Sequence, residues 1–401
     1  MAMDVFLPSS TSHREPGRYA PVRVAVIGLG YWGPNLVRNL QECGNSELVA
    51  VCDKRIDALE KIGRRYPAVK MTTDLADVLA SDEIDAVAIA TPVATHHLIA
   101  AAALRAGKHV FVEKPLAFST AEALDLARLA DENGCVLMPG HTFLYSPPVS
   151  KVRDLIVEGE LGEIYFITSS RMNLGIYQPD GVVCDLAPHD ISILLYWLGR
   201  SVSVVAASGC TVFQEGVPET AFLTLSFEEG CTANVQISWL APRKVRQMVV
   251  VGSKRMVQYD DTSSDDIVRV YDRGFDFAQP ANFGEYKLTY RSGDMVAPRI
   301  LAAEPLSLEL EDFAAAITKG RQPRSDARLG LEIVRVLEAA HASLQAHGRP
   351  IGIERRDGEP VALPGAVPAG ALAVNGYGHR PNGNGLAGGG TDHPNGNGRA
   401  A

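Results

Sequence analysis

A glycine pattern directly after a short apolar run constrains the fold of this chain most. Residues 22–27 are rich in β-branched side chains, as in a buried strand, and they lead into Gly28, Gly30 and Gly33, after which a helical pattern begins. In this context Gly28 allows the tight turn, Gly30 lets backbone amides approach a pyrophosphate, and Gly33 lets the helix pack closely on the strand. The pattern predicts the first unit of a dinucleotide-binding domain.

An acidic residue at the end of the next apolar run extends this prediction. Residues 47–52 have the composition of a strand and end at Asp53, about twenty residues beyond Gly33. A carboxylate there bonds the ribose 2′-hydroxyl and repels a 2′-phosphate, so it favours NAD. Lys54 and Arg55 beside it keep NADP open as an alternative.

Two further apolar runs end in proline-containing turns. Residues 85–90 run into Thr91-Pro92, and residues 109–112 run into Glu113-Lys114-Pro115. Helical patterns separate the runs, which predicts a parallel, doubly wound sheet whose strand ends form the ligand site. Both turns should therefore face the nicotinamide half of the cofactor. The predicted cofactor contacts are Gly28, Gly30, Tyr31, Trp32, Gly33, Asp53, Thr91, Pro92, His96, Glu113 and Lys114.

The pattern changes from alternating helices and strands to successive strands after about residue 146. Two hairpins are predicted, at residues 221–239 and 245–259, and they indicate a mainly antiparallel sheet. Such a sheet must cover its second face, so we expect self-association through that face. The predicted division is a disordered segment at 1–20, a dinucleotide-binding domain at 21–145, a substrate and oligomerisation domain at 146–363, and a disordered Gly/Asn-rich tail at 364–401.

Composition bounds the class of protein. The net charge of −9 argues against a general nucleic-acid surface. No apolar run approaches the length of a membrane span, and residues 1–20 lack the apolar region of a secretory signal. The six cysteines have no C-x-x-C spacing, so we expect reduced thiols and a cytoplasmic protein. No His, Cys and Asp cluster has ligand spacing, so we expect no metal.

The second domain holds another group of reactive side chains. Pro188 fits a first helical position, so we expect a helix to begin there, with Asp185 just before it and His189 in its first turn. The positive helix end would disfavour an imidazolium and Asp185 would favour it, which suits a general base. The alternative is that Asp185 and Asp190 only complement the helix terminus and His189 is a surface residue.

Together these features resemble the glucose-fructose oxidoreductase and inositol dehydrogenase family over about residues 21–350. In that family a Glu-Lys-Pro motif lies near the nicotinamide and an Asp-x-x-x-His motif completes the site. The resemblance implies Lys114, Asp185 and His189 as the catalytic group. It also implies an α/β fold, with a Rossmann domain followed by an α+β domain that carries a large, open-faced and mainly antiparallel sheet, in a homodimer or homotetramer. Residues 140–145 depart from the asparagine or arginine stretch of many members.

The resemblance also suggests the reaction. His189 would take the proton of a sugar hydroxyl, Lys114 would bond the developing alkoxide, and Asp185 would orient the imidazole as hydride leaves for NAD.

The flanking residues suggest a substrate. Residues 171–177 and 238–244 are similar to nucleotide-sugar 3-dehydrogenases, which implies C3 of a UDP-sugar such as UDP-N-acetylglucosamine or its uronate. The candidate substrate contacts are Arg171, Tyr177, Arg243 and Lys244. Oxidation of a free polyol or sugar of the inositol type, and an NAD-binding sensor without turnover, are the alternatives.

Overall fold

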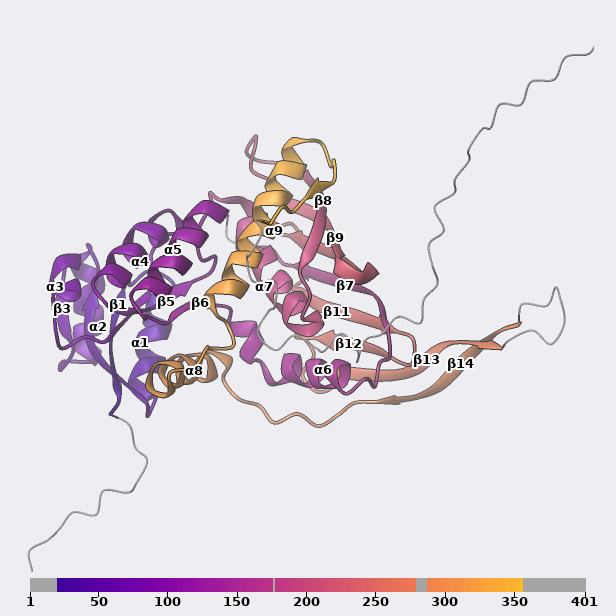
Figure 1. Cartoon of the computed structure of the whole chain (residues 1–401), viewed down its shortest axis with the longest axis horizontal. Helices are drawn as coiled ribbons and strands as arrows, with labels where there is room; N and C mark the ends of the chain where they lie inside the picture. The colour runs from indigo at the N-terminus through magenta and orange to yellow at the C-terminus, as the bar shows by residue number, and fades with distance from the viewer. Residues whose placement is uncertain (1–19, 176, 279–286, 356–401) are drawn as a thin grey trace, which may run out of the picture.

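The computed structural model describes residues 20–175, 177–278 and 287–355. Nearly all of the two segments that we expect to be disordered, 1–20 and 364–401, lie outside these described residues. The described chain forms two sheets with two late helices between them (Figure 1).

The first sheet has six parallel strands in the order β3-β2-β1-β4-β5-β6. Its strands are β1 (Val22–Ile27), β2 (Ser46–Cys52), β3 (Lys70–Thr72), β4 (Ala86–Ile89), β5 (His109–Glu113) and β6 (Leu137–Gly140). The helices are α1 (Gly33–Glu42), α2 (Ile56–Arg65), α3 (Leu75–Leu79), α4 (His96–Arg105) and α5 (Thr120–Glu132). Central strands such as β4 are buried along their whole length because helices cover both faces. This confirms the predicted doubly wound sheet.

The second sheet has nine strands in the order β14-β13-β12-β11-β7-β10-β9-β8-β15. Their bounds are β7 (Ile164–Met172), β8 (Val202–Cys210), β9 (Thr220–Phe227), β10 (Thr232–Ser238), β11 (Val245–Gly252), β12 (Met256–Asp260), β13 (Val268–Ala278), β14 (Lys287–Val296) and β15 (Ile351–Gly352). All pairs are antiparallel except β7 with β10. One face is buried, as at Ile167 and Leu223, whereas Phe166 and Phe222 on the other face are 45% and 46% exposed. The open-faced sheet is thus confirmed.

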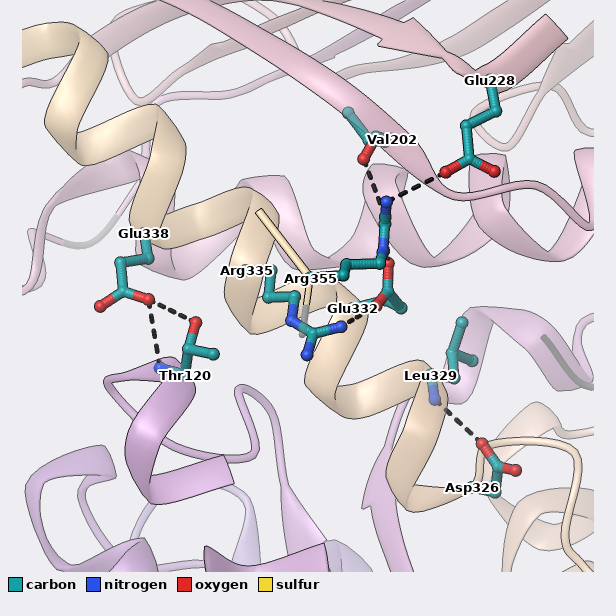
Figure 2. A network of polar contacts seen from close by, with 9 residues as sticks. All are labelled: Thr120, Val202, Glu228, Asp326, Leu329, Glu332, Arg335, Glu338 and Arg355. Carbon is teal, nitrogen blue, oxygen red and sulfur yellow. Dashed lines mark hydrogen bonds and ion pairs between the residues drawn. The ribbon is translucent and has the colours of Figure 1, made fainter. Parts of the chain in front are cut away.

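Two late helices join the sheets. These are α8 (Pro305–Lys319) and α9 (Ala327–Gln345), drawn between the two halves in Figure 1. Figure 2 shows Glu338 of α9 accepting hydrogen bonds from Thr120 at the start of α5. On the other side of α9, Glu332 binds Arg335 and Arg355, and Arg355 reaches the Val202 carbonyl oxygen at 2.9 Å. Polar contacts on both sides of α9 therefore fix one sheet relative to the other.

The helix that carries His189 begins earlier than expected. α7 runs over Gly181–Leu198 and contains Pro188 in its interior, so the prediction that the helix begins at Pro188 is wrong. Pro188 has no amide proton, and the bond that it would give to the Cys184 carbonyl is therefore missing. Val182 and Val183 are fully buried before the proline, and this packing outweighs the missing bond. Among the described residues, α7 is the one helix with the length and hydropathy of a membrane span, and 72% of that stretch is buried within the protein.

Candidate active site

The glycine loop after β1 has the geometry that a pyrophosphate requires. Gly28 has a φ of +94°, and a Cβ there would lie 2.7 Å from the Ala90 carbonyl oxygen. A Cβ at Gly33 would lie 2.1 Å from the Gly28 carbonyl oxygen, whereas one at Gly30 would meet open space. Gly28 and Gly33 thus bring the loop, strand and helix close together, and Gly30 leaves its backbone open to a ligand. These residues fit a dinucleotide.

Asp53 lies beside this loop, as predicted. Its Oδ2 accepts a 2.7 Å hydrogen bond from the Leu29 amide, and the Arg55 guanidinium contacts the same oxygen at 3.1 Å. Burial alone would raise the pKa of Asp53, but the hydrogen bonds from Arg55 and Leu29 outweigh burial and lower that pKa. A charged carboxylate is therefore held beside the glycine loop, with an arginine against it.

His96 is buried between two strand ends. Its ring is 1% exposed, with Nδ1 at 2.9 Å from the Pro115 carbonyl oxygen and Nε2 at 2.9 Å from that of Thr91. The ring thus lies between the turn after β4 and the turn after β5, and a neutral ring donates a hydrogen bond to one of these two carbonyl oxygens. The expected contact of His96 with the cofactor stays a prediction.

Lys114 and Asp185 meet across the two domains. The Lys114 Nζ atom is 2.7 Å from the Asp185 carbonyl oxygen and 3.1 Å from its Oδ1, and the side chains are 19% and 29% exposed. The other carboxylate oxygen accepts a 3.1 Å hydrogen bond from Trp239 Nε1, a residue that was not among the predicted contacts. The carboxylate thus holds the ammonium at the end of β5.

His189 lies one helical turn beyond Asp185 on α7. Its ring packs edge-on against Phe143, with ring centroids 5.1 Å apart, and its Nδ1 atom is buried without a hydrogen-bond partner. Burial lowers the pKa of His189 well below its ordinary value, and the charges of Lys114 and Arg171 lower it further. The expected influence of a helix terminus is wrong, because α7 begins eight residues earlier, at Gly181. Within the described ranges, no hydrogen bond joins Asp185 to His189.

Glu113 points away from the lysine that follows it. Glu113 is only 9% exposed, and burial raises its pKa to about 8. Glu309 of α8 lies near it and also has a pKa raised by burial, while Thr142 donates a 2.7 Å hydrogen bond to Glu309. On the glycine-loop side, Trp32 lies beside Glu113, and Tyr31 is 86% exposed and stacked on Trp32.

The four candidate substrate contacts fall into two groups. Arg171, a candidate substrate contact, is 3% exposed; its guanidinium is bound to Asp190 and lies 4.4 Å from the ring centroid of Phe143. Its position follows from the inward orientation of its side chain on β7. Tyr177 is 41% exposed and packs on Trp239 with ring centroids 5.7 Å apart. Arg243 and Lys244 are exposed and have no ion pair within the described part of the chain.

Comparisons with known proteins agree with this geometry. Residues 22–141 match a family model described as an oxidoreductase family with an NAD-binding Rossmann fold, and residues 149–258 match the GFO/IDH/MocA C-terminal domain. UDP-N-acetylglucosamine 3-dehydrogenase of Acidithiobacillus ferrooxidans is 28% identical over 80% of this chain and 95% of its own. 4-Carboxy-2-hydroxymuconate-6-semialdehyde dehydrogenase of Sphingobium sp. is 27% identical over 82% of this chain and 100% of its own.

A solved structure with bound NAD has a similar fold. GenD2 from gentamicin A biosynthesis, solved in complex with NAD, superposes with a TM-score of 0.71 at 25% identity, over 88% of this chain and 100% of its own. Its likeness covers both sheets, and the NAD-binding family model spans the glycine loop, Asp53 and Lys114. The chain therefore belongs to the GFO/IDH/MocA family of NAD(P)-dependent oxidoreductases, which act on hydroxyl groups.

Proposed function

We propose that this protein oxidises a hydroxyl group of a nucleotide sugar to a ketone, at C3 of a UDP-sugar such as UDP-N-acetylglucosamine or its uronate. One observation carries the proposal. The Asp185 carboxylate binds Lys114 on one side and Trp239 on the other, and Trp239 packs on the exposed ring of Tyr177. The reactive side chains thus lie next to an aromatic surface. A substrate that carries both a sugar and a nucleobase can contact the two at once.

The chemistry follows from the charges of the side chains. Bound NAD supplies the hydride acceptor. The pKa of His189 is lowered, so the ring is neutral at neutral pH and has an unprotonated nitrogen that can accept the proton of the substrate hydroxyl. Lys114 donates a hydrogen bond to the oxygen on which negative charge develops. Asp185 keeps the ammonium in place through its carboxylate and its backbone carbonyl oxygen, which is a different role from the orientation of His189 that the motif suggests.

The side chains beyond Trp239 suit a nucleoside diphosphate. Leu174 and Phe213 are 80% and 74% exposed, and Tyr177 offers a ring face on which a base can stack. Arg243 and Lys244 follow Trp239 closely in the chain and offer charge-assisted hydrogen bonds to a diphosphate. The relative from A. ferrooxidans, which is named for C3 oxidation of UDP-N-acetylglucosamine, supports the position of attack.

A ligand panel tests the proposal. Thermal unfolding is measured with NAD alone and then with added UDP-N-acetylglucosamine, its uronate, UDP, glucose or myo-inositol, and NADH formation is followed by absorbance. We expect the two UDP-sugars to raise the unfolding temperature and to be oxidised, and UDP to stabilise without turnover. Stabilisation and turnover by myo-inositol alone would contradict the proposal and favour a polyol dehydrogenase, a function for which scyllo-inositol 2-dehydrogenase of Bacillus subtilis, 26% identical, is named.

A pair of variants sharpens the panel. Arg243→Ala should raise the KM of the UDP-sugar roughly ten- to a hundredfold, because a charge-assisted hydrogen bond contributes roughly 1.5–3 kcal/mol. Arg105→Ala removes another exposed arginine, at the end of α4, and serves as the matched control, with no effect on the KM. Equal effects of both substitutions would contradict a diphosphate contact at Arg243.

The setting of the enzyme is part of the proposal. All six cysteines are free, which supports work in a reducing cytoplasm. The exposed aromatic side chains of the open sheet face, Phe166 and Phe222, support a homodimer or homotetramer built through that face.

A further inference from the structure

We propose that the buried ion pair of Arg171 and Asp190 positions His189, and that it acts through the ring of Phe143. This inference rests on the proposed role of His189 as the base. Arg171 comes from β7 and Asp190 from α7, the residue after His189. The arginine Nε atom is 2.8 Å from Oδ2 and its Nη2 atom is 3.0 Å from Oδ1, so the pair has the two-pronged geometry that fixes both side chains.

The guanidinium also has a second contact. Its Cζ atom lies 4.4 Å from the ring centroid of Phe143, and the guanidinium of Arg246 lies 5.5 Å from the same centroid. Phe143 belongs to η2 (Thr142–Tyr145), and its ring in turn meets the edge of His189. The order of contacts is therefore Asp190, Arg171, Phe143 and His189, which closes a loop because Asp190 and His189 are neighbours in the chain.

Asp190 lies in a part of α7 that has lost a backbone hydrogen bond. Pro188 removes one backbone hydrogen bond in the turn that carries His189, so the direction of that turn is less strongly fixed. Two other contacts hold this turn, namely Lys114 on the Asp185 carbonyl oxygen and Arg171 on the Asp190 carboxylate. Successive helical residues point about 100° apart, so an anchored Asp190 sets the direction of His189.

Stabilisation of the fold is a weak explanation for the buried ion pair of Arg171 and Asp190. The two side chains are 4% and 2% exposed, and the Arg171 Nη1 atom is buried without a hydrogen-bond partner. Replacement of a buried ion pair by apolar residues of similar volume is often neutral or stabilising. A role in the position of His189 accounts for a buried charge beside an aromatic ring.

The pair also affects the protonation of His189. The groups that face its ring from other elements are Lys114 at the end of β5, His141 after β6, Arg171 on β7 and Arg246 on β11, and each lowers its pKa. The carboxylates of its own helix, Asp185 and Asp190, are bound to Lys114 and Arg171. Loss of the Arg171 charge should therefore raise the pKa of His189. Since a base must be neutral, the acid limb of the pH profile should move to higher pH.

Two variants with different defects test the inference. The double variant Arg171→Leu/Asp190→Leu removes both charges without leaving one unpaired, and Arg171→Lys keeps the charge but loses the two-pronged contact. Arg324→Lys is the matched control, because Arg324 stacks on Tyr145 of the same η2 segment at 4.9 Å. The readouts are kcat, the KM of NAD⁺, and the ring pKa of His189 from NMR of histidine-labelled protein, with His189→Asn to identify its signal.

We expect kcat to fall roughly ten- to a hundredfold in both Arg171 variants, since a misplacement of about 1 Å in a catalytic group can cost that much. The KM of NAD⁺ should stay within about twofold of wild type, and Arg324→Lys should leave kcat unchanged. His189 should titrate at higher pH in the double variant and as in wild type in Arg171→Lys.

Three results would overturn the inference: kcat unchanged in both Arg171 variants, an equal loss in Arg324→Lys, or His189 titrating in the double variant as it does in wild type. If the double variant does not fold, the test is the comparison of kcat between Arg171→Lys and Arg324→Lys. A loss in Arg171→Lys alone supports the inference, and equal values contradict it. If wild type oxidises no sugar, the proposed function fails, and the NMR titration, which needs no substrate, still decides this inference.

Discussion

Replacement of Lys114 by methionine is the most direct test of the active site. Methionine keeps the length of the side chain and removes all three N–H donors, including those 2.7 Å and 3.1 Å from Asp185. If Lys114 stabilises the developing alkoxide, its loss should lower kcat by about 10²–10³, which corresponds to about 3–4 kcal/mol of transition-state stabilisation. Turnover is measured by NADH absorbance with the best substrate of the ligand panel.

Stability should change much less than turnover. Lys114 and Asp185 are both partly exposed, at 19% and 29%, so solvent screens the pair. A pair of this kind contributes about 1 kcal/mol or less to folding. Urea unfolding of Lys114→Met should therefore lie close to that of wild type, and its Kd for NAD⁺, measured by calorimetry, should be similar.

A second lysine of the same segment provides the matched control. Lys108 lies at the other end of β5, is 8% exposed, and donates hydrogen bonds of 2.7 Å and 2.8 Å to the Ser81 and Ile84 carbonyl oxygens. Lys108→Met leaves two acceptors without their partner, so it should lower stability by about 1–3 kcal/mol and leave kcat nearly unchanged. Turnover of Lys114→Met within about threefold of wild type, or an equal loss in Lys108→Met, would refute the assignment of Lys114 to the reaction.

Three further predictions concern other parts of the molecule. His189→Asn keeps a polar side chain that cannot take up a proton, so kcat should fall by about 10²–10⁴ with NAD⁺ affinity retained, and unchanged turnover in the absorbance assay would count against His189 as the base. Burial raises the pKa of Glu113 to about 8, whereas its ordinary value is 4.5. Its contribution to the free energy of unfolding is therefore fully present below pH 4.5 and is lost as the pH rises towards about 8. Urea unfolding of Glu113→Gln should vary less across this pH range, with the buried Glu309 accounting for a residual slope; an unaltered slope would show that Glu113 does not titrate in this way. Phe222→Asp places a charge on the open sheet face and should lower the sedimentation coefficient at micromolar concentration, whereas identical sedimentation would exclude this face as the subunit contact.

The sequence predicts the first sheet better than the second for a physical reason. Each strand of the parallel sheet is followed by its own helix, so the local pattern already contains the order of elements. In the second sheet, β7 lies between β11 and β10, and its parallel partner β10 begins at Thr232, far along the chain. Local patterns give the hairpins but not such distant pairings. The start of α7 is likewise decided by the burial of Val182 and Val183 and not by Pro188.

Residue types in the site are easier to predict than their environments. The glycine loop and Asp53 follow from motifs whose spacing reflects the chemistry, whereas Lys114 and Asp185 are placed in one catalytic group only by the family resemblance. Burial depends on tertiary packing, so the inward positions of His96 and Arg171 could not be read from the sequence. The same holds for side chains that support others. Phe143, Asp190 and Trp239 have no motif of their own and gain their significance only from the neighbours that the fold gives them.

The pairing of Lys114 illustrates this dependence most clearly. In the sequence, the adjacent Glu113 is the obvious counter-ion, but successive side chains at the end of a strand point to opposite sides. Glu113 is buried near Glu309, where burial raises its pKa to about 8, so it carries little negative charge at neutral pH. The carboxylate that meets Lys114 comes from α7 of the second domain. Lys114 therefore has a carboxylate partner only where α7 of the second domain contacts the end of β5. Substitutions that separate α7 from β5 should abolish turnover without altering the glycine loop.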